Sequence, residues 1–377
     1  MTGPVDVGIV GGGVVGLACA WRLAQRGLSV TVVDPSPGEG ASHAAAGMLA
    51  PVTEAHYGEE PLLALNLESA RRWPAFAAEL EEEGGDVGYR DEGTLAVALD
   101  DDDLRALDEL RRFQESLGLG VERLRARACR AAEPCLSPRV RGGVLVAGDH
   151  QVDSRLVVRA LLAAAGRSGA TIRRERVTGV VAEAGRVAGL RTDAGALHCA
   201  TVVVAAGCWS AGIGGVPPEV LPPVRPVKGQ ILRLRFDPAV PPLTSTVRGL
   251  AAGRSVYLVP RARGELVVGA TVEERGFDTT VTAEAVHDLL AAAIALVPEV
   301  GQLELVETTA GLRPGTPDNA PALGATDIAG LAVATGHHRN GVLLAPVTAD
   351  AIVSLVTDGA VPPLATAFDP RRFARCT

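Results

Sequence analysis

This 377-residue sequence contains almost no lysine: Lys228 is the only one, and the other basic residues are arginines. Acidic residues outnumber basic ones by 44 to 36, and the net charge of -8 argues against nucleic acid or an anionic membrane as a partner. The six cysteines show no CxxC pair and no metal-ligand spacing. We therefore expect no metal site, and free buried thiols in a reducing cytoplasm.

Long hydrophobic runs are also missing. Residues 289–297 form an apolar run, but it is far shorter than the roughly 18 residues that a membrane span needs. Hydrophobic residues make up 47% of the chain and charged residues 21%, which is typical of a globular protein. A chain of this length is too long for one compact core, so we expect two domains.

The most informative segment is residues 5–34, VDVGIVGGGVVGLACAWRLAQRGLSVTVVD. It predicts a buried strand, a glycine turn, a helix and a second strand. Gly11, Gly13 and Gly16 have G-x-G-x-x-G spacing, which allows a tight turn, close approach of a pyrophosphate and close helix packing. Asp34 follows about 20 residues later, where a carboxylate accepts hydrogen bonds from a ribose. These features favour a dinucleotide-binding unit over an ordinary βαβ turn.

The rest of the chain alternates between helical and extended patterns. We expect a β-meander over 171–204 that ends in a buried central strand, and a proline-rich crossing between domains at 217–226. The sequence predicts helices at 62–83, 101–117, 154–166, 283–296 and 345–355, and further strands at 93–99, 230–236, 255–259, 266–271 and 331–334. The nucleotide-binding domain is thus expected to be discontinuous, with a second domain inserted.

Four regions resemble the D-amino-acid oxidase family of FAD enzymes, and within it the glycine-oxidase branch of thiamin biosynthesis. They are residues 5–34, AAAGMLAP at 44–51, VVAAGCWS at 203–210, and the tail, in which AGLRPGTPD at 310–318 precedes GHHRNG at 336–341. The resemblance implies an α/β + β fold. A Rossmann-like FAD-binding domain (1–82, 149–222, 306–377) would carry an inserted antiparallel-sheet substrate domain (83–148, 223–305).

The cofactor implied by the resemblance is non-covalent FAD. The positions that would contact it are Gly11, Gly13, Val14, Val15, Gly16 and Asp34 at the ADP half; Ser42, Ala45, Ala46, Gly47 and Met48 beside the pyrophosphate and flavin; Val177 at adenine; Ala206, Gly207 and Trp209 as support; Arg313; and His338, Arg339, Asn340, Gly341 and Val342 around the flavin's pyrimidine edge. Asp34 stands where FAD members more usually have glutamate, which leaves an NAD interpretation open.

Three catalytic positions also follow from the resemblance. Arg313 would bind the substrate carboxylate, a bidentate task that suits a guanidinium; a salt bridge at the domain interface is the alternative. Tyr257 would orient the substrate through its hydroxyl, unless the ring only packs on a sheet. Arg339 would lie near the flavin and the rim of the site, although a purely structural role is equally compatible with the sequence.

Four further positions bear on the site. Lys228 either shapes the site entrance or a strand start, or is a solvated surface lysine. His43 lies close to the segment where related dimethylglycine-type enzymes attach flavin covalently, but its offset from Gly47 differs, so we interpret it as a solvated or capping histidine. Ser255 and Val272 replace a histidine and a methionine of glycine oxidase, so pocket size and polarity are expected to differ.

The implied reaction is oxidative deamination of glycine, small N-alkyl glycines or D-amino acids, by hydride transfer to flavin N5, with O2 reduced to H2O2. The product imine would supply the thiazole of thiamin, through hand-off to a thiazole synthase, and the enzyme would be a homo-oligomer. A sarcosine- or D-amino-acid oxidase or dehydrogenase on the same fold is the near alternative. A nicotinamide-dependent dehydrogenase and a non-catalytic dinucleotide-binding protein are the alternatives from other classes.

Overall fold

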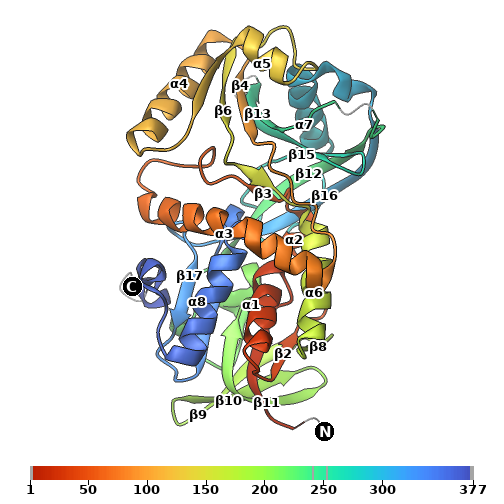
Figure 1. The fold of residues 1–377 in the computed structure, drawn as a ribbon. Helices are drawn as coiled ribbons and strands as arrows, with labels where there is room; N and C mark the ends of the chain where they lie inside the picture. The colour runs from red at the N-terminus through yellow and green to blue at the C-terminus, as the bar shows by residue number, and fades with distance from the viewer. Residues whose placement is uncertain (1–2, 240–241, 252–253, 374–377) are drawn as a thin grey trace.

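The computed structural model describes residues 3–239, 242–251 and 254–373. Figure 1 shows two lobes, one above the other, each built around its own sheet, with both ends of the described chain in the lower lobe. The chain passes between the lobes several times, because strands from distant parts of the sequence share each sheet. The α/β + β fold expected from the resemblance is confirmed.

The lower lobe contains the dinucleotide-binding sheet, ordered β17-β18-β11-β1-β2-β8, with β10 and β9 continuing from β11. Its strands are β1 (Val5–Val10), β2 (Val30–Val33), β8 (Thr171–Arg173), β9 (Val177–Glu183), β10 (Arg186–Thr192), β11 (Gly195–Val204), β17 (Ala322–Ala325) and β18 (Leu331–Thr335). Val10 of the central strand pairs with Val33 and with Val204, all in parallel strands. Three carboxyl ends therefore reach the same edge, where open α/β sheets bind ligands.

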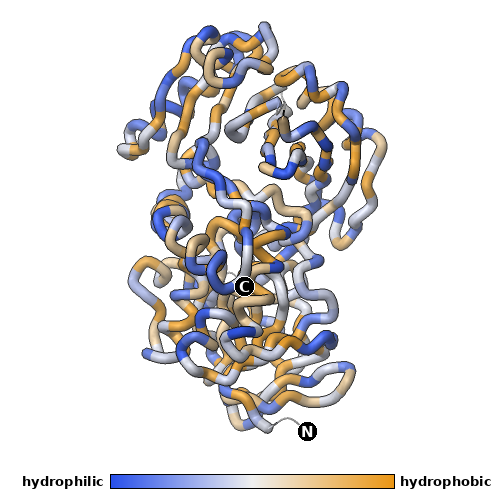
Figure 2. Tube along the Cα trace, turned by 45° about the vertical axis from the view of Figure 1, so that its right-hand side comes forward, coloured by the Kyte–Doolittle hydropathy of each residue, from blue (hydrophilic) through white to orange (hydrophobic). Residues whose placement is uncertain are grey.

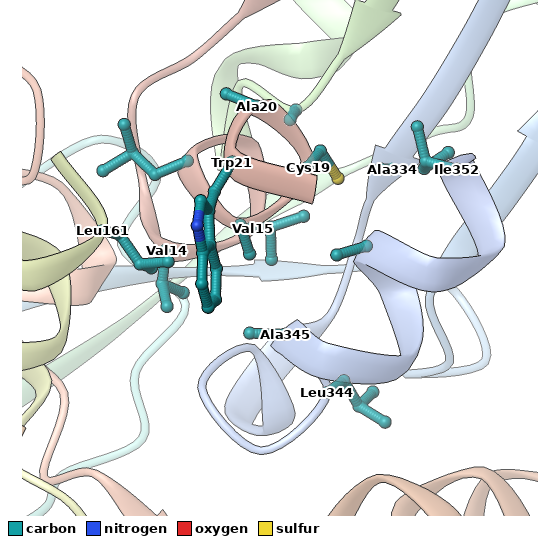
Figure 3. Packing of buried hydrophobic residues seen from close by; sticks show 14 of the residues in the cluster. Val14, Val15, Cys19, Ala20, Trp21, Leu161, Ala334, Leu344, Ala345 and Ile352 are labelled. Atoms are coloured by element: carbon teal, nitrogen blue, oxygen red, sulfur yellow. The ribbon is translucent and has the colours of Figure 1, made fainter. Parts of the chain in front are cut away.

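Helices cover this sheet. Figure 1 shows α1 (Val14–Gln25), α6 (Ser154–Arg167) and α8 (Ala345–Asp358) side by side on one face, with α3 (Glu60–Gly84) crossing above them. Figure 3 shows Trp21 of α1 pointing between Leu161 of α6 and the start of α8. Trp21 is fully buried, and its ring meets Phe76 of α3 edge-on with centroids 5.2 Å apart. This packing fixes the direction of α1 and hence of its N-terminus.

The upper lobe contains the second sheet, ordered β16-β12-β15-β14-β13-β4-β6-β5. Its members are β4 (Thr94–Ala98), β5 (Glu122–Arg125), β6 (Gly142–Val146), β12 (Arg225–Arg235), β13 (Thr246–Ala251), β14 (Arg254–Arg261), β15 (Glu265–Gly269) and β16 (Glu304–Gly315), with helices α4 (Asp101–Ser116), α5 (Ala126–Ala132) and α7 (Ala283–Leu296). The sheet is antiparallel except for the parallel pair β4–β13. Its core is the apolar face that packs against α7.

One expected domain boundary differs from the sheet topology. The division at residue 306 falls inside β16, which pairs along its length with β12 of the upper sheet. The hydrogen-bonded ladder therefore keeps this part of the tail in the upper lobe until Gly315, although its residues carry the family-like motif. Short elements join the lobes: α2 (Ala41–Ala44), β3 (Met48–Leu49) and β7 (His150–Gln151).

Each lobe has its own apolar core, and Figure 2 shows hydrophobic residues distributed through both. In the described part of the chain, no single helix has the length and apolar composition of a membrane span. Taken together, α8 and the helical residues 363–373 have that length and composition, but the two segments are bent by 102° at the break between them. The five cysteines that the structure describes are free, and Cys376 lies outside the described residues.

Candidate functional site

A cavity of about 1440 Å³ lies between the two sheets. It begins at the carboxyl edge of the lower sheet and extends to strands of the upper one, with Val10 and Asp34 at one end and Tyr257 and Arg313 at the other. Typical small-ligand pockets measure roughly 300–1,000 Å³. The cavity is therefore large enough for an extended dinucleotide together with a small substrate.

The glycine turn forms the floor of one end. Gly11 has φ of 107°, and a Cβ atom there would collide with the carbonyl of Ala205 on the neighbouring segment. Gly13 is the N-cap of α1 and lines the cavity, so the N-terminus of the helix opens onto it, where N–H groups of the first turn lack carbonyl partners within the helix. This is the cradle that a pyrophosphate requires, because those N–H groups and the helix dipole attract negative charge.

Asp34 lies at the end of β2 and lines the same end of the cavity. Its Oδ2 accepts a hydrogen bond from the Gly12 N–H at 2.7 Å, and its Oδ1 accepts one from the Ser36 N–H at 2.7 Å. Each carboxylate oxygen can accept more than one hydrogen bond. The carboxylate can therefore hold the glycine turn and still accept from a ribose diol.

The segment from α2 to β3 forms the middle of the cavity wall. Ser42 accepts a hydrogen bond from the Val14 N–H at 3.0 Å, which ties α2 to the start of α1. Gly47 has φ of 70°, and a Cβ there would collide with the carbonyl of Val152. Arg261, which is buried, donates to the carbonyls of Ala46 and Val152 and so fixes this close approach. The backbone of 45–48 can therefore lie directly against a bound ring.

The loop after β18 lines the cavity with most of residues 337–342 and leads into α8. Its carbonyl at Leu343 accepts hydrogen bonds from Ser69 Oγ at 2.6 Å and from Trp73 Nε1 at 2.8 Å, both on α3. His337 Nε2 lies 3.0 Å from Thr348 Oγ1 of α8. Burial lowers the pKa of His337 to about 3, so the ring is neutral at pH 7. These contacts hold the loop in one shape at the start of α8.

Arg313 enters the cavity from β16. Its Nη1 donates to the carbonyls of Thr271 at 3.1 Å and Lys228 at 3.4 Å. Among the described residues, no carboxylate lies within ion-pair distance of it. The interface salt bridge that we considered for Arg313 is therefore not seen in the described part of the chain, and the guanidinium keeps donors for a ligand.

Two further arginines of the cavity are paired with one carboxylate. Arg248 Nη1 lies 2.7 Å from Glu54 Oε1, and Arg339 Nε lies 3.7 Å from Glu54 Oε2. Burial opposes ionisation of Glu54, but the charges of Arg248 and Arg339 outweigh it and hold the pKa below its usual value. This end of the cavity thus has three guanidinium groups and one carboxylate.

Tyr257, on β14, lines the cavity beside Arg313. Burial raises the pKa of its hydroxyl, so Tyr257 is a neutral donor at pH 7. The ring also packs in a cluster with the buried side chains of Ile231 and Val259. Tyr257 can therefore pack on the sheet and still orient a ligand through its hydroxyl.

Two further histidines line the same cavity. Burial, followed by the charges of nearby arginines, lowers the pKa of His338 to about 4. Burial also lowers the pKa of His56.

Nearly all the site residues named from the sequence line this one cavity. The lining residues among them are Gly11, Gly13, Val14, Val15, Asp34, Ser42, Ala45, Ala46, Gly47, Met48, Val177, Ala206, Gly207, Trp209, Tyr257, Arg313, His338, Arg339, Gly341 and Val342. Gly16 and Asn340 do not line it. A Cβ at Gly16 would collide with the Gly11 carbonyl, which explains the glycine by packing. Asn340 is buried, and its carbonyl accepts from the Leu344 N–H at 2.8 Å, which starts α8.

The solvated-surface alternative for Lys228 is wrong. Its side chain is 1% exposed, and Nζ lies 2.9 Å from Asp278 and 3.7 Å from Glu273. Both acids belong to the segment between β15 and α7, so the lysine attaches that segment to β12. His43 is half-exposed, 3.9 Å from Glu307, and does not line the cavity.

Sequence reasoning missed Glu54 and Arg248, which are 194 positions apart. Glu54 follows the family-like AAAGMLAP segment by only a few positions, and this closeness to the motif is the signal in the sequence that indicates it. Arg248 lies on β13, in a stretch that showed no strand signal. No cluster of metal-ligating side chains occurs in the described ranges.

Comparison with known proteins identifies the class. Residues 6–355 match the family described as DAO, FAD dependent oxidoreductase, which spans most of the chain. The chain belongs to this family of FAD-dependent oxidoreductases, and the residues of the cavity fit its cofactor.

Individual relatives of the chain include glycine oxidases and bifunctional ThiO/ThiG proteins. The glycine oxidase of Geobacillus kaustophilus is 36% identical over 360 residues, 94% of each chain. Its crystal structure superposes with a TM-score of 0.90 at 34% identity, covering 98% of both chains. The bifunctional protein ThiO/ThiG of Trichormus variabilis is 36% identical over 374 residues, 98% of this chain and 55% of that protein. The chain thus spans about half the length of these bifunctional relatives.

Proposed function

We propose that this protein oxidises glycine, and small N-alkyl glycines, to the corresponding imine with FAD as the cofactor and O2 as the electron acceptor. The observation that carries the proposal is Arg313. It is the one guanidinium at the Tyr257 end of the cavity without a carboxylate partner among the described residues. A planar guanidinium binds a carboxylate bidentately, so an α-amino acid is the ligand that this end of the cavity fits.

Charge at this end favours the reactive form of the amine. Three arginines and one glutamate leave an excess of two positive charges, and a bound carboxylate cancels only one of them. A positive surrounding disfavours an ammonium ion and so lowers the pKa of the amine. Oxidation of a C–N bond requires a neutral amine with its lone pair free. The neutral His338 and the shifted His56 add no positive charge at pH 7.

Positioning is the remaining task of the protein. Arg313 would hold the carboxylate and the Tyr257 hydroxyl would orient it, while Met48 and Ile231 supply an apolar wall. When bound, FAD supplies the two-electron oxidation, and the protein contributes orientation and electrostatics. The loop from 337 to 342 would surround the cofactor's pyrimidine edge, and bonds from α3 to the carbonyl of the adjoining Leu343 would hold it there. These roles of individual residues are part of the proposal.

The biological role that we propose is supply of glycine imine for the thiazole of thiamin. Its support is the match to relatives named ThiO/ThiG, over about half of their length. A free imine hydrolyses in water, so direct hand-off to a thiazole synthase, in a cytoplasmic homo-oligomer, would protect it. Free thiols at the five described cysteines are compatible with a reducing compartment.

A sarcosine- or D-amino-acid-type specificity is the second candidate. The observation that favours it is the open rim of the substrate end, where Val272 is 74% exposed and Ser255 is exposed as well. Larger amines would find room there.

A substrate panel tests both candidates. Purified protein reconstituted with FAD is incubated in air with glycine, sarcosine, D-alanine and D-proline, and peroxide and ammonia or methylamine are measured. The proposal expects the highest kcat/KM for glycine or sarcosine. Preference for D-alanine or D-proline would support the second candidate, an oxidase of the same reaction type with another substrate. If none of the four amines gives peroxide, the proposal is refuted.

A further inference from the structure

We infer that Glu54 is a specificity-determining residue that keeps amines with a second anionic group out of the site. The inference rests on the proposed function, because it assumes that Arg313 binds the substrate's first carboxylate. A second carboxylate would need a second guanidinium whose charge is not already opposed by a carboxylate of the protein. Both other guanidinium groups at this end, those of Arg248 and Arg339, already face Glu54.

Glu54 is well placed for this task because its backbone is fixed. The preceding residues are held by Asp149, which accepts from the Val52 N–H at 3.1 Å and the Thr53 N–H at 2.7 Å. Gln114 of α4 donates to the Val52 carbonyl at 2.8 Å. The backbone at Glu54 is therefore fixed, and the hydrogen bond from Arg248 Nη1 at 2.7 Å holds the carboxylate.

Exposure supports an interior role rather than a surface ion pair. The side chain of Glu54 is 12% exposed and that of Arg248 is 19% exposed, and both line the cavity. An ion pair on an exposed surface contributes little to stability. An ion pair inside a pocket determines which charged groups of a ligand are accepted there. Glu54 takes the Nη1 donor of Arg248, balances part of the positive charge of Arg248 and Arg339, and repels a second anion directly.

Glu54→Gln tests the inference, because glutamine keeps the shape and removes the charge. The probes are iminodiacetate and its monoamide, N-(carbamoylmethyl)glycine, which have nearly the same shape and differ in one carboxylate. The readout is the ratio of kcat/KM for the two amines within one enzyme preparation, so that flavin content and folding cancel. We expect the original protein to prefer the monoamide by at least 10-fold, and the variant to reduce that preference at least 10-fold.

Two matched variants make the result specific. Glu60→Gln removes an exposed carboxylate a few positions away that does not line the cavity, and should leave the ratio unchanged. The double variant Glu54→Gln/Arg248→Gln should restore part of the discrimination, because it also removes the guanidinium that hydrogen-bonds Glu54 and leaves only Arg339, which lies farther from it.

A binding measurement separates this inference from the proposed function. Calorimetry on the FAD-loaded proteins compares the binding of oxydiacetate, which has two carboxylates, with that of methoxyacetate, which has one. Both compounds are ethers, so neither can be oxidised as an amine. We expect Glu54→Gln to tighten oxydiacetate at least 10-fold relative to methoxyacetate. An unchanged ratio in both experiments would overturn the inference while glycine oxidation stands. If no amine is oxidised but the binding ratio shifts, the proposed function fails and the role of Glu54 in anion selection remains.

Discussion

Asp34 accepts a hydrogen bond from the Gly12 N–H at 2.7 Å, so the acid at the end of β2 and the glycine turn at the end of β1 form one unit. The sequence pattern assigns this acid to the ribose of a dinucleotide. The structure adds that the same carboxylate fixes the backbone over which the pyrophosphate would lie. Loss of the carboxylate should therefore weaken FAD binding in two ways: it removes a partner of the ribose and it loosens the turn that would hold the pyrophosphate.

We predict that Asp34→Ala weakens FAD binding by about 10- to 100-fold, since a hydrogen bond to a charged group contributes about 1.5–3 kcal/mol. Fluorescence titration of the apoprotein with FAD measures the change. Asp34→Glu should retain more affinity than Asp34→Ala. The control is Asp6→Ala, which removes an acid that bonds to Ser29 away from the cavity. Equal affinity for Asp34→Ala and the original protein would contradict the assignment.

Replacement of Arg313 should weaken the binding of the substrate. We expect Arg313→Met to lower kcat/KM for glycine by at least about 100-fold, because the carboxylate loses a bidentate charged partner. Arg313→Lys should recover only a small part, since an ammonium group cannot bind in the same planar fashion.

The control for Arg313 is Arg235→Met, which removes an exposed arginine paired with Glu304 on the same sheet. Steady-state kinetics with glycine and the thermal midpoint are measured for all the variants. A loss of thermal stability with unchanged kcat/KM would show that Arg313 serves only the stability of the upper lobe, through its bonds to the Lys228 and Thr271 carbonyls.

Tyr257→Phe separates orientation from packing, because phenylalanine keeps the ring and removes the hydroxyl. We expect KM for glycine to rise about 2- to 10-fold, as for the loss of one hydrogen bond worth roughly 0.5–1.5 kcal/mol, with the thermal midpoint unchanged. Tyr89→Phe is the matched control: its hydroxyl lies 2.6 Å from His150 Nδ1, and it does not line the cavity. A Tyr257→Phe enzyme with unaltered KM would support packing alone.

His337 predicts a pH dependence of stability. Burial lowers its pKa to about 3 in the folded protein, against an ordinary value of 6.5. Between these two values the unfolded chain binds more protons, so the free energy of unfolding falls as the pH decreases from about 6.5 toward 3. The contribution is fully present above pH 6.5. His337→Gln cannot gain this proton, and its stability should fall less steeply with acid, by up to about 1.4 kcal/mol per pH unit.

Urea unfolding of the FAD-saturated proteins between pH 7 and pH 4.5 measures this difference. His198→Gln, which changes an exposed histidine of β11, is the control and should follow the original protein. If His337→Gln and the original protein lose stability in parallel, the buried neutral histidine is not responsible.

Local patterns predicted the elements that depend on nearby residues. The glycine turn, the helix that starts at Ser154 after its cap Asp153, and α7 all follow from spacing, capping and periodicity within a short window. The resemblance to a family then indicated Arg313 and Tyr257, which come from different strands and share one cavity.

Long-range pairing explains what the sequence did not reveal. Arg248, on β13, hydrogen-bonds Glu54, which is 194 positions away in the sequence, and no local pattern indicates such a contact. Lys228 resembles a surface lysine in sequence but is buried by acids from the segment after β15. The β12–β16 ladder likewise depends on residues far apart in the chain, which is why the boundary at 306 was misplaced.

The most direct test of the central claim is an anaerobic titration of the FAD-loaded protein with glycine, followed by the absorbance of oxidised flavin. The account predicts that glycine bleaches this absorbance, that air restores it with formation of peroxide, and that Arg313→Met requires far more glycine for the same change. A flavin that glycine, sarcosine and D-amino acids all leave oxidised would contradict the account.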